Sequence, residues 1–348
     1  MKGTMRGICK SKPGVGAEYR EDLPIPQITE DEVLIKVHAT AICGTDIHLY
    51  HWNDYAQKRM TDLPMVFGHE TAGEIVEMGK NVTGYQLGDR ISVETHVPCN
   101  RCWQCQNGNP HICENQRIFG VTDPGAFAEY APVHKDCIVR LDEGITYEMG
   151  AMLEAMGAGV HGVEVAKVQG KRVLVSGCGP IGLMTIGACK AHGAKQIIAC
   201  DLIDQKLEIA KTMGADIVVN SKTVHLPDFV RSRTDGVGVD AVIDITGSKQ
   251  AIVAGLKAVR KGGIFVSVGL PNGEVGLNLT EDIIYREVIY TGVSGRLMFE
   301  TWEDCMRILQ TPGFSLEPVI GGIYPLCAFE KALEDMKKGA PGKMILIP

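Results

Sequence analysis

The sequence predicts an α/β protein with two domains, one rich in β-strands and one built on a doubly wound parallel sheet. Three observations lead to this prediction. The chain has 348 residues, more than one ordinary core accommodates. Residues 1–151 contain short alternating runs interrupted by Pro and Gly, which is typical of β-structure. From residue 152 onward, continuous apolar runs alternate with helix-length segments, and such runs mark strands buried on both faces.

The elements can be placed in order along the chain. Strands of the first domain are expected at "EVLIKVHA" (32–39), "TAGEIVEMG" (71–79) and "DRISVETH" (89–96). Parallel strands of the second are expected at "RVLVSG" (172–177), "QIIACD" (196–201), "DAVIDIT" (240–246) and "GIFVSVG" (263–269), with a helix at "DQKLEIAKTMG" (204–214). The tail predicts helices over 298–310 and 329–339 and a last strand over 343–348. Periodicity alone does not assign this tail to either domain.

Composition excludes several classes of function. Hydrophobic residues make up 45% and charged residues 22%, and no apolar run approaches the ~20 residues that span a bilayer, so no membrane partner is expected. The net charge is −7 with scattered Lys and Arg, so we expect a small-molecule substrate and no nucleic-acid partner. The N-terminus lacks the apolar segment of a secretory signal, which predicts a cytoplasmic protein whose cysteines are reduced or bind metal.

A dinucleotide site is predicted at "RVLVSGCGPIGL", where an apolar strand runs into Gly177, Gly179 and Gly182 and then into a helix. The glycines allow a tight turn and a close approach of the pyrophosphate. The helix that starts at Pro180 and Ile181 offers it free backbone N–H groups, although Pro180 itself has none.

An acidic residue follows this turn at the expected distance. Asp201 ends the next strand, nineteen residues after Gly182, where it accepts hydrogen bonds from ribose hydroxyls and repels a 2′-phosphate. Lys206 lies five residues further and is included among the cofactor-binding candidates. NAD is therefore expected rather than NADP. A glycine turn without a ligand is the alternative, and the combination of strand, spacing and acid disfavours it.

Four cysteines in "CNRCWQCQNGNPHIC", Cys99, Cys102, Cys105 and Cys113, share one short loop. Four thiolates complete a tetrahedron around Zn²⁺ and leave no position for substrate, so this spacing predicts a structural zinc site. A redox Cys-x-x-Cys pair is the alternative.

A second group of metal-ligand types is dispersed. Cys43 lies in "AICGTDIHLYHW", directly after the strand predicted over 32–39, and His69 and Glu70 lie in "FGHETAGEIVEMG". Cysteine, imidazole and carboxylate together are typical of a zinc site that keeps a position for water or substrate. Spacing does not prove that they converge.

Taken together, "CGTDIH", "GHETAGEIVEMGKNVTGYQLGDRI", the four-cysteine loop and the later G-x-G-x-x-G resemble the zinc-dependent medium-chain alcohol dehydrogenases, in that order and across essentially the whole chain. The resemblance implies a GroES-like, β-rich catalytic domain over 1–152 and 292–348, and a Rossmann NAD-binding domain over 153–291. It further implies one catalytic and one structural zinc per subunit, and a homotetramer.

The resemblance also implies roles for individual residues. Cys43, His69 and Glu154 would be the protein ligands of the catalytic zinc, with Glu70 either coordinating or lying just outside. Thr45 would take a hydrogen bond from the substrate hydroxyl, and His48 would pass the proton toward water.

Within the family, three stretches resemble the branch that oxidises the secondary alcohol of L-threonine with NAD: "HWNDYAQKRMTDLPMVFGHE", "SVETHVPC" and "GVSGRLMFETW". The first alternative is a polyol or secondary-alcohol dehydrogenase of the sorbitol or butanediol kind. It stays open because "LEAMGAGVH" departs from the family's usual sequence after the Glu, beside the metal site. A non-catalytic dinucleotide-binding protein is the second.

Overall fold

The computed structural model describes residues 2–348, and contacts divide the chain into two compact units. The first comprises Met1–Ala155 and Ile320–Pro348, and the second comprises Met156–Val319. Among the described residues, no helix combines the length and the apolar character needed to cross a bilayer.

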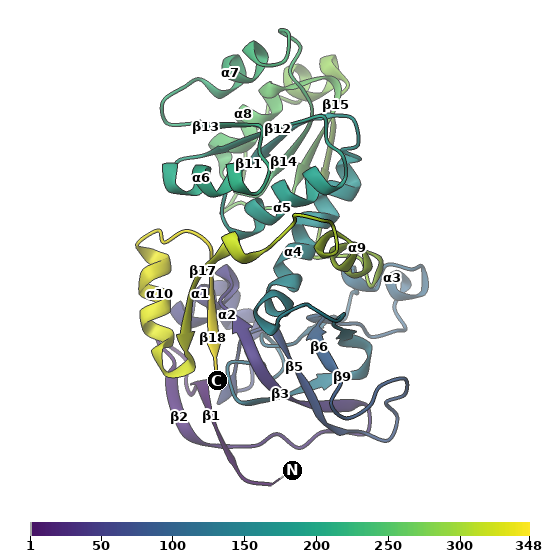
Figure 1. The fold of residues 1–348 in the computed structure, drawn as a ribbon, viewed down its shortest axis with the longest axis vertical. Helices are drawn as coiled ribbons and strands as arrows, with labels where there is room; N and C mark the ends of the chain where they lie inside the picture. Colours follow the sequence, from purple (N-terminus) through teal and green to yellow (C-terminus); the bar gives the residue numbers. More distant parts are fainter. Residues whose placement is uncertain (1) are drawn as a thin grey trace. The chain divides into compact units, whose positions relative to one another are not determined.

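The first unit is mostly β-structure (Figure 1). Its strands are β1 (Thr4–Lys10), β2 (Glu18–Pro24), β3 (Glu32–Ala41), β4 (Met65–Val66), β5 (Glu70–Met78), β6 (Arg90–Val93), β7 (His96–Val97), β8 (Arg117–Ile118), β9 (Tyr130–His134), β10 (Ile138–Arg140), β17 (Ile320–Pro325) and β18 (Lys343–Ile347). Its helices are α1 (Gly44–His51), α2 (Asp54–Arg59), α3 (Trp103–Gln106) and α10 (Phe329–Lys337). The longer helix α4 (Tyr147–Ala166) carries residues of both units.

One sheet of the first unit joins segments from both ends of the chain. Its order is β10-β6-β5-β3-β18-β17, with β9 also paired to β3. Ala41 at the end of β3 lies opposite Glu70 at the start of β5 and, on its other side, opposite Ile345 of β18. This register brings the loop after β3, the start of β5 and the final strand to one place in the sheet.

The second unit is a parallel sheet covered on both faces. Its strands are β11 (Arg172–Ser176), β12 (Gln196–Asp201), β13 (Ile217–Asn220), β14 (Val239–Asp244), β15 (Val259–Ser267) and β16 (Ile289–Gly292). Its further helices are α5 (Pro180–Ala191), α6 (Asp204–Thr212), α7 (Leu226–Ser232), α8 (Lys249–Ala258) and α9 (Glu300–Leu309). The order β13-β12-β11-β14-β15-β16 is the doubly wound order of dinucleotide-binding folds, with α5 and α6 on one face and α7 and α8 on the other (Figure 1).

The predicted fold class is confirmed, and the strands over 32–39, 71–79, 172–177 and 196–201 coincide with β3, β5, β11 and β12 to within a few residues. The predicted strand over 89–96 is interrupted, because β6 ends at Val93 and β7 begins only at His96.

The second domain boundary lies elsewhere than the resemblance implied. Residues 292–319 were assigned to the first domain, but contacts place them in the second unit. The physical reason is local burial: Trp302 of α9 is buried, Thr301 donates a hydrogen bond to Glu164 of α4 (2.9 Å), and Asp304 pairs with His192 (2.7 Å). The first boundary, near residue 152, differs by only a few residues.

Candidate active site and metal centres

Cys43 occupies the N-cap of α1, directly after β3. Its backbone N–H donates to Asp46 Oδ2 (2.8 Å), and the Cys43 carbonyl accepts from the Asp46 N–H (3.1 Å). Asp46 is fully buried and, by binding the start of the helix, fixes the direction of the Cys43 side chain. Asp46 thus holds the backbone of this turn.

The start of β5 supplies the partners of Cys43. Sulfur, ring nitrogen and carboxylate oxygen of Cys43, His69 and Glu70 lie within 4.8 Å of one another. Residues separated by 26 positions therefore meet because β3 and β5 pair in the register described above. Cys43, His69 and Glu70, whose convergence the spacing in the sequence did not prove, thus come together in the structure.

Lys343 of β18 completes this cluster, and sequence reasoning missed it. Its Nζ donates to Glu70 Oε1 over 2.5 Å, and both side chains are almost wholly buried. Burial opposes the charged lysine, but the negative charges around it, first that of Glu70 and then that of Cys43, raise the pKa of Lys343. The two partners are 273 residues apart in the sequence, so no local pattern indicates the pair.

The chemistry of these residues fits a bound cation. Asp46 Oδ1, His69 Nδ1 and Glu70 Oε2 are buried and have no hydrogen-bond partner among residues 2–348. Asp46 Oδ1 and His69 Nδ1 are 3.5 Å apart, a charge contact without hydrogen-bond geometry. Burial opposes protonation of His69, but the charges of Asp46 and then Cys43 raise its pKa. An environment that favours a positive charge on a buried imidazole is also one in which a metal cation is stabilised.

Glu154 lies near this cluster but outside the group formed by the other three ligand types. It is 9% exposed on α4, and Thr95 Oγ1 donates to its Oε1 over 3.3 Å. Burial raises the pKa of Glu70, Lys343 opposes the rise, and the charge of Glu154 adds to it. Two carboxylates in one low-dielectric site repel each other, and a cation between them removes that cost. The structure thus places Glu70, more closely than Glu154, with Cys43 and His69.

Thr45 and His48 both lie on α1, three residues apart and therefore on the same helix face. Thr45 is half-buried and His48 is exposed. The His48 ring is held by Asn53, whose Nδ2 lies 2.8 Å from His48 Nδ1. A hydroxyl and an imidazole can therefore act in sequence on one side of the helix that Cys43 starts.

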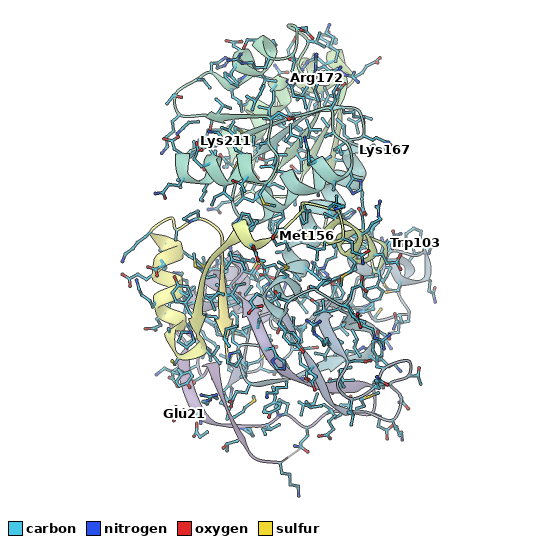
Figure 2. All side chains as sticks on the ribbon, in the orientation of Figure 1. Glu21, Trp103, Met156, Lys167, Arg172 and Lys211 are labelled. Carbon is cyan, nitrogen blue, oxygen red and sulfur yellow. The ribbon has the colours of Figure 1, made fainter. Side chains whose placement is uncertain are left out.

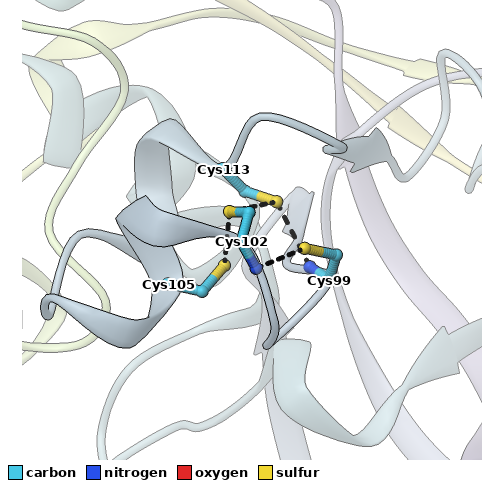
Figure 3. Close-up of side chains that lie close together, drawn as sticks. All are labelled: Cys99, Cys102, Cys105 and Cys113. Carbon is cyan, nitrogen blue, oxygen red and sulfur yellow. Dashed lines mark hydrogen bonds between the residues drawn. The ribbon is translucent and has the colours of Figure 1, made fainter.

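The four cysteines of the loop around α3 converge as predicted (Figure 3). Cys102 Sγ lies 3.5 Å from Cys105 Sγ and 3.8 Å from Cys113 Sγ. Four thiolates about 2.3 Å from a central Zn²⁺ have sulfur atoms about 3.8 Å apart, so these separations fit a tetrahedral zinc site.

Backbone N–H groups stabilise the thiolates of this loop. The Cys99 N–H donates to Cys113 Sγ and the Cys102 N–H to Cys99 Sγ, each over 3.3 Å. The backbone of Arg101, with a further contribution from Cys102, lowers the pKa of Cys99 to about 6. Beside the cluster, the side chain of Trp103 is 64% exposed (Figure 2). All four sulfurs lie on one loop, so a metal ion bound by them would keep no position for substrate.

The glycine turn of the second unit has the predicted geometry. Gly177 has φ +95°, a conformation that L side chains rarely adopt. A Cβ at Gly182 would lie 1.8 Å from the Gly177 carbonyl oxygen, so only glycine allows this approach of helix and strand. At Gly179 a Cβ would meet nothing within 4 Å, and α5 begins at the next residue with Pro180 and Ile181. Open space at a helix N-terminus fits a phosphate group.

Asp201 lies beside the glycine turn and is also hydrogen-bonded to its backbone. Its Oδ2 accepts from the Cys178 N–H (2.7 Å), and its Oδ1 accepts from Leu202 (2.7 Å) and Ile203 (3.0 Å). Lys206 is close enough that its charge opposes the burial-driven rise in the pKa of Cys178. The structure therefore places Asp201 at the glycine turn, and it gives Asp201 a structural function that the sequence did not indicate.

Comparison with known proteins decides the family. Residues 29–143 match the family described as "Alcohol dehydrogenase GroES-like domain", and residues 180–311 match "Zinc-binding dehydrogenase". The chain is 41% identical to an L-threonine 3-dehydrogenase of Caldanaerobacter subterraneus subsp. tengcongensis and 40% identical to one of Pyrococcus horikoshii, in alignments covering all of this chain and 100% and 99% of those proteins. The chain belongs to the zinc-dependent medium-chain alcohol dehydrogenases.

Solved structures of this family share the fold across the whole chain. A zinc-binding dehydrogenase from Sinorhizobium meliloti bound to NADP superposes with a TM-score of 0.91 at 26% identity, covering 99% of both chains. A 2R,3R-butanediol dehydrogenase from Bacillus subtilis superposes with a TM-score of 0.88, also at 26% identity and 99% coverage.

Proposed function

We propose that this dehydrogenase oxidises the secondary alcohol of L-threonine to 2-amino-3-ketobutyrate and transfers the hydride to NAD. The convergence of Cys43, His69 and Glu70 carries the proposal, in a chain that aligns end to end with curated L-threonine 3-dehydrogenases at 38–41% identity. The reaction is a step of threonine degradation.

Each cofactor has a proposed set of residues. When bound, zinc lowers the pKa of the substrate hydroxyl and NAD accepts the hydride. We assign the catalytic zinc to Cys43 and His69 together with Glu154 or Glu70, and the structural zinc to Cys99, Cys102, Cys105 and Cys113. The proposed NAD contacts are Gly177, Gly179, Pro180, Ile181, Gly182, Asp201 and Lys206.

The proton that the substrate hydroxyl loses is handled by α1. Thr45 accepts the hydrogen bond of the hydroxyl, and His48, one turn later and exposed, exchanges the proton with water. Glu154 offers an acceptor for the substrate ammonium, as do Glu94 and His96, which lie one and three residues after Val93 at the end of β6. Support comes from the bond between Thr95 and Glu154 and from the 2.7 Å contact of His96 Nδ1 with buried Glu94.

A substrate panel tests the proposal. Zinc-replete protein is incubated with NAD and L-threonine, sorbitol or 2,3-butanediol, and NADH is followed by absorbance. The proposal expects the highest kcat/KM for L-threonine. A higher kcat/KM for sorbitol or 2,3-butanediol would support a polyol or secondary-alcohol dehydrogenase, an alternative that the structural similarity to a butanediol dehydrogenase also suggests. No turnover of any alcohol would support a non-catalytic dinucleotide-binding protein.

Asp201→Asn is expected to weaken NAD binding by about tenfold or more and to narrow the margin over NADP, because hydrogen bonds to a charged group contribute about 1.5–3 kcal/mol. The asparagine oxygen can still accept from Leu202 and Ile203, whereas the bond from the Cys178 N–H is lost. The exposed Glu208→Gln on α6 removes the same charge and serves as control. Cofactor titrations by fluorescence measure both constants, and an unchanged NAD-to-NADP ratio in Asp201→Asn would remove this assignment.

His48→Ala is expected to slow turnover mainly at lower pH, where release of the substrate proton is hardest. His51→Ala is the matched control, because His51 is an exposed imidazole at the end of the same helix. The pH profile of kcat/KM is measured for both variants. A deficit in His48→Ala that is equal at every pH would argue against proton transfer through this ring.

We further propose a cytoplasmic homotetramer. Within residues 2–348, edge strand β16 pairs only with β15, and Ile289 and Tyr290 are 60% and 40% exposed. Ile284 and Tyr285, just before it, are 63% and 68% exposed. An apolar edge with unpaired backbone groups is stabilised by pairing with a second copy of the strand. Ile289→Glu should therefore lower the mass measured by light scattering.

A further inference from the structure

Asn53 stands between α1 and α2 and makes two kinds of hydrogen bond. Its Oδ1 accepts from the backbone N–H groups of Tyr55 (3.1 Å) and Ala56 (3.2 Å), which makes it the N-cap of α2. Its Nδ2 lies 2.8 Å from His48 Nδ1. One side chain thus connects the start of α2 to the imidazole of α1.

The two backbone donors decide which way the amide faces. If the Asn53 amide were turned over, its NH₂ group would point at the N–H groups of Tyr55 and Ala56, and donors would face donors. The oxygen therefore belongs to the cap and the NH₂ group to His48. Since NH₂ can only donate, His48 Nδ1 accepts, and in the neutral ring the hydrogen is on Nε2.

A protonated His48 cannot keep this bond. An imidazolium ring carries N–H donors on both nitrogens and has no acceptor, so the Asn53 amide must separate from Nδ1 when the ring takes up a proton. By contrast, His96 Nδ1 faces the carboxylate of Glu94 over 2.7 Å, where the ring nitrogen is the donor. The Nδ1 atoms of His48 and His96 thus have opposite hydrogen-bonding roles.

We propose that Asn53 is a positioning residue for this reaction, one that holds neutral His48 in the Nε2–H tautomer and releases Nδ1 each time His48 accepts a proton. The inference rests on the proposed relay function of His48. If the side chain at position 53 were a hydrogen-bond acceptor, neutral His48 would instead carry its hydrogen on Nδ1, and the protonated form of the ring would be stabilised.

Other groups near His48 are accounted for on both helices. The Tyr55 ring lies 6.2 Å from the His48 ring, centroid to centroid, and Arg59 lies 5.6 Å from the Tyr55 centroid. The remaining titratable groups on these two helices are Asp46, Tyr50 and His51 of α1 and Asp54 and Lys58 of α2, and the Tyr50 hydroxyl is bonded to Glu330. Asp46 is directed to Cys43 and His69, and the His48 ring is hydrogen-bonded to Asn53.

Two substitutions separate the cap from the contact with His48. Asn53→Asp keeps an N-cap oxygen and replaces the amide donor with an acceptor, and Asn53→Ser keeps a cap but is too short to bind His48. Lys58→Gln is the charge control, because it changes the net charge of α2 by −1, as Asn53→Asp does, from an exposed position. Similar thermal midpoints of all variants would show that the cap is preserved.

Two readouts test the proposal. In ¹⁵N-histidine-labelled protein, with the His48 signals assigned by difference from His48→Gln, the wild type should show an unprotonated Nδ1 and a protonated Nε2, and Asn53→Asp should show a protonated Nδ1. In the pH profile of kcat/KM, the acidic limb of Asn53→Asp should lie about one pH unit higher than in the wild type. Lys58→Gln should leave the limb in place, and Asn53→Ser should give a mixture of tautomers.

The two readouts fail separately. A wild-type ring with its hydrogen on Nδ1, or one unaltered in Asn53→Asp, overturns the assignment of Asn53 whatever the enzyme's activity. If the tautomer reverses in Asn53→Asp but the acidic limb stays at its wild-type pH, Asn53 still sets the tautomer, and the proposed relay function of His48 is what fails.

Discussion

Cys43→Ser is expected to abolish turnover while NAD binding persists. Cys43 is the sulfur of the three-residue group with His69 and Glu70, and a serine hydroxyl is a much poorer zinc ligand than a thiolate. Loss of a Lewis acid that contributes several kcal/mol to the transition state corresponds to a fall of about 10³-fold or more in kcat. The glycine turn belongs to the second unit, so cofactor affinity should change little.

Turnover of L-threonine, zinc content by mass spectrometry and an NAD titration measure the three parts of this expectation. Cys327→Ser is the matched control, because Cys327 is an exposed cysteine of the same unit and lies outside both cysteine-containing clusters. It should retain activity and two zinc ions. Equal loss of turnover and NAD binding in Cys43→Ser would contradict the assignment, since it would indicate general unfolding.

Lys343→Met is expected to lower the stability of the first unit by about 3–5 kcal/mol, because it leaves the Glu70 carboxylate buried without its cation. For a unit of this size the thermal midpoint should fall by on the order of 10 °C. Lys343→Arg, which keeps the charge, should be less affected. The double variant Glu70→Gln with Lys343→Met should recover part of the loss, because a neutral amide costs less to bury than a carboxylate.

An exposed ion pair gives the comparison for this result. Lys331 Nζ binds Asp335 over 2.7 Å on α10, with Lys331 57% exposed, and such pairs contribute about 0–1 kcal/mol. Lys331→Met should therefore shift the thermal midpoint only slightly. If Lys343→Met shifted it no more than Lys331→Met, the buried pair would not be a main support of the site.

The sequence predicted the parts of the site that local chemistry determines. The four cysteines lie within fifteen residues, so their spacing alone indicates a closed tetrahedron, and the glycine turn is recognisable because strand, glycines and helix follow one another directly. Cys43 could be placed directly after a predicted strand, but its role as a zinc ligand was implied by the family resemblance. The cysteine loop and the glycine turn are short enough that their local geometry does not depend on how distant segments of the chain pair.

Features that depend on pairing between distant segments could not be predicted in this way. Lys343 reaches Glu70 only because β18 inserts between β3 and β17, and no periodicity in "KMILIP" indicates that neighbour. The extent of the second unit was missed because the mixed pattern after residue 292 does not reveal that Trp302 and Thr301 are buried there. The capping function of Asn53 was missed because it depends on where α1 ends.

Metal dependence tests the account most directly. Protein freed of metal by a chelator and then reloaded with zinc is assayed with L-threonine and NAD, with the metal content measured in each preparation. The account predicts no turnover without metal, and recovery when the second zinc per chain is bound after the structural site has filled. Equal oxidation of L-threonine by metal-free and zinc-loaded protein would contradict it.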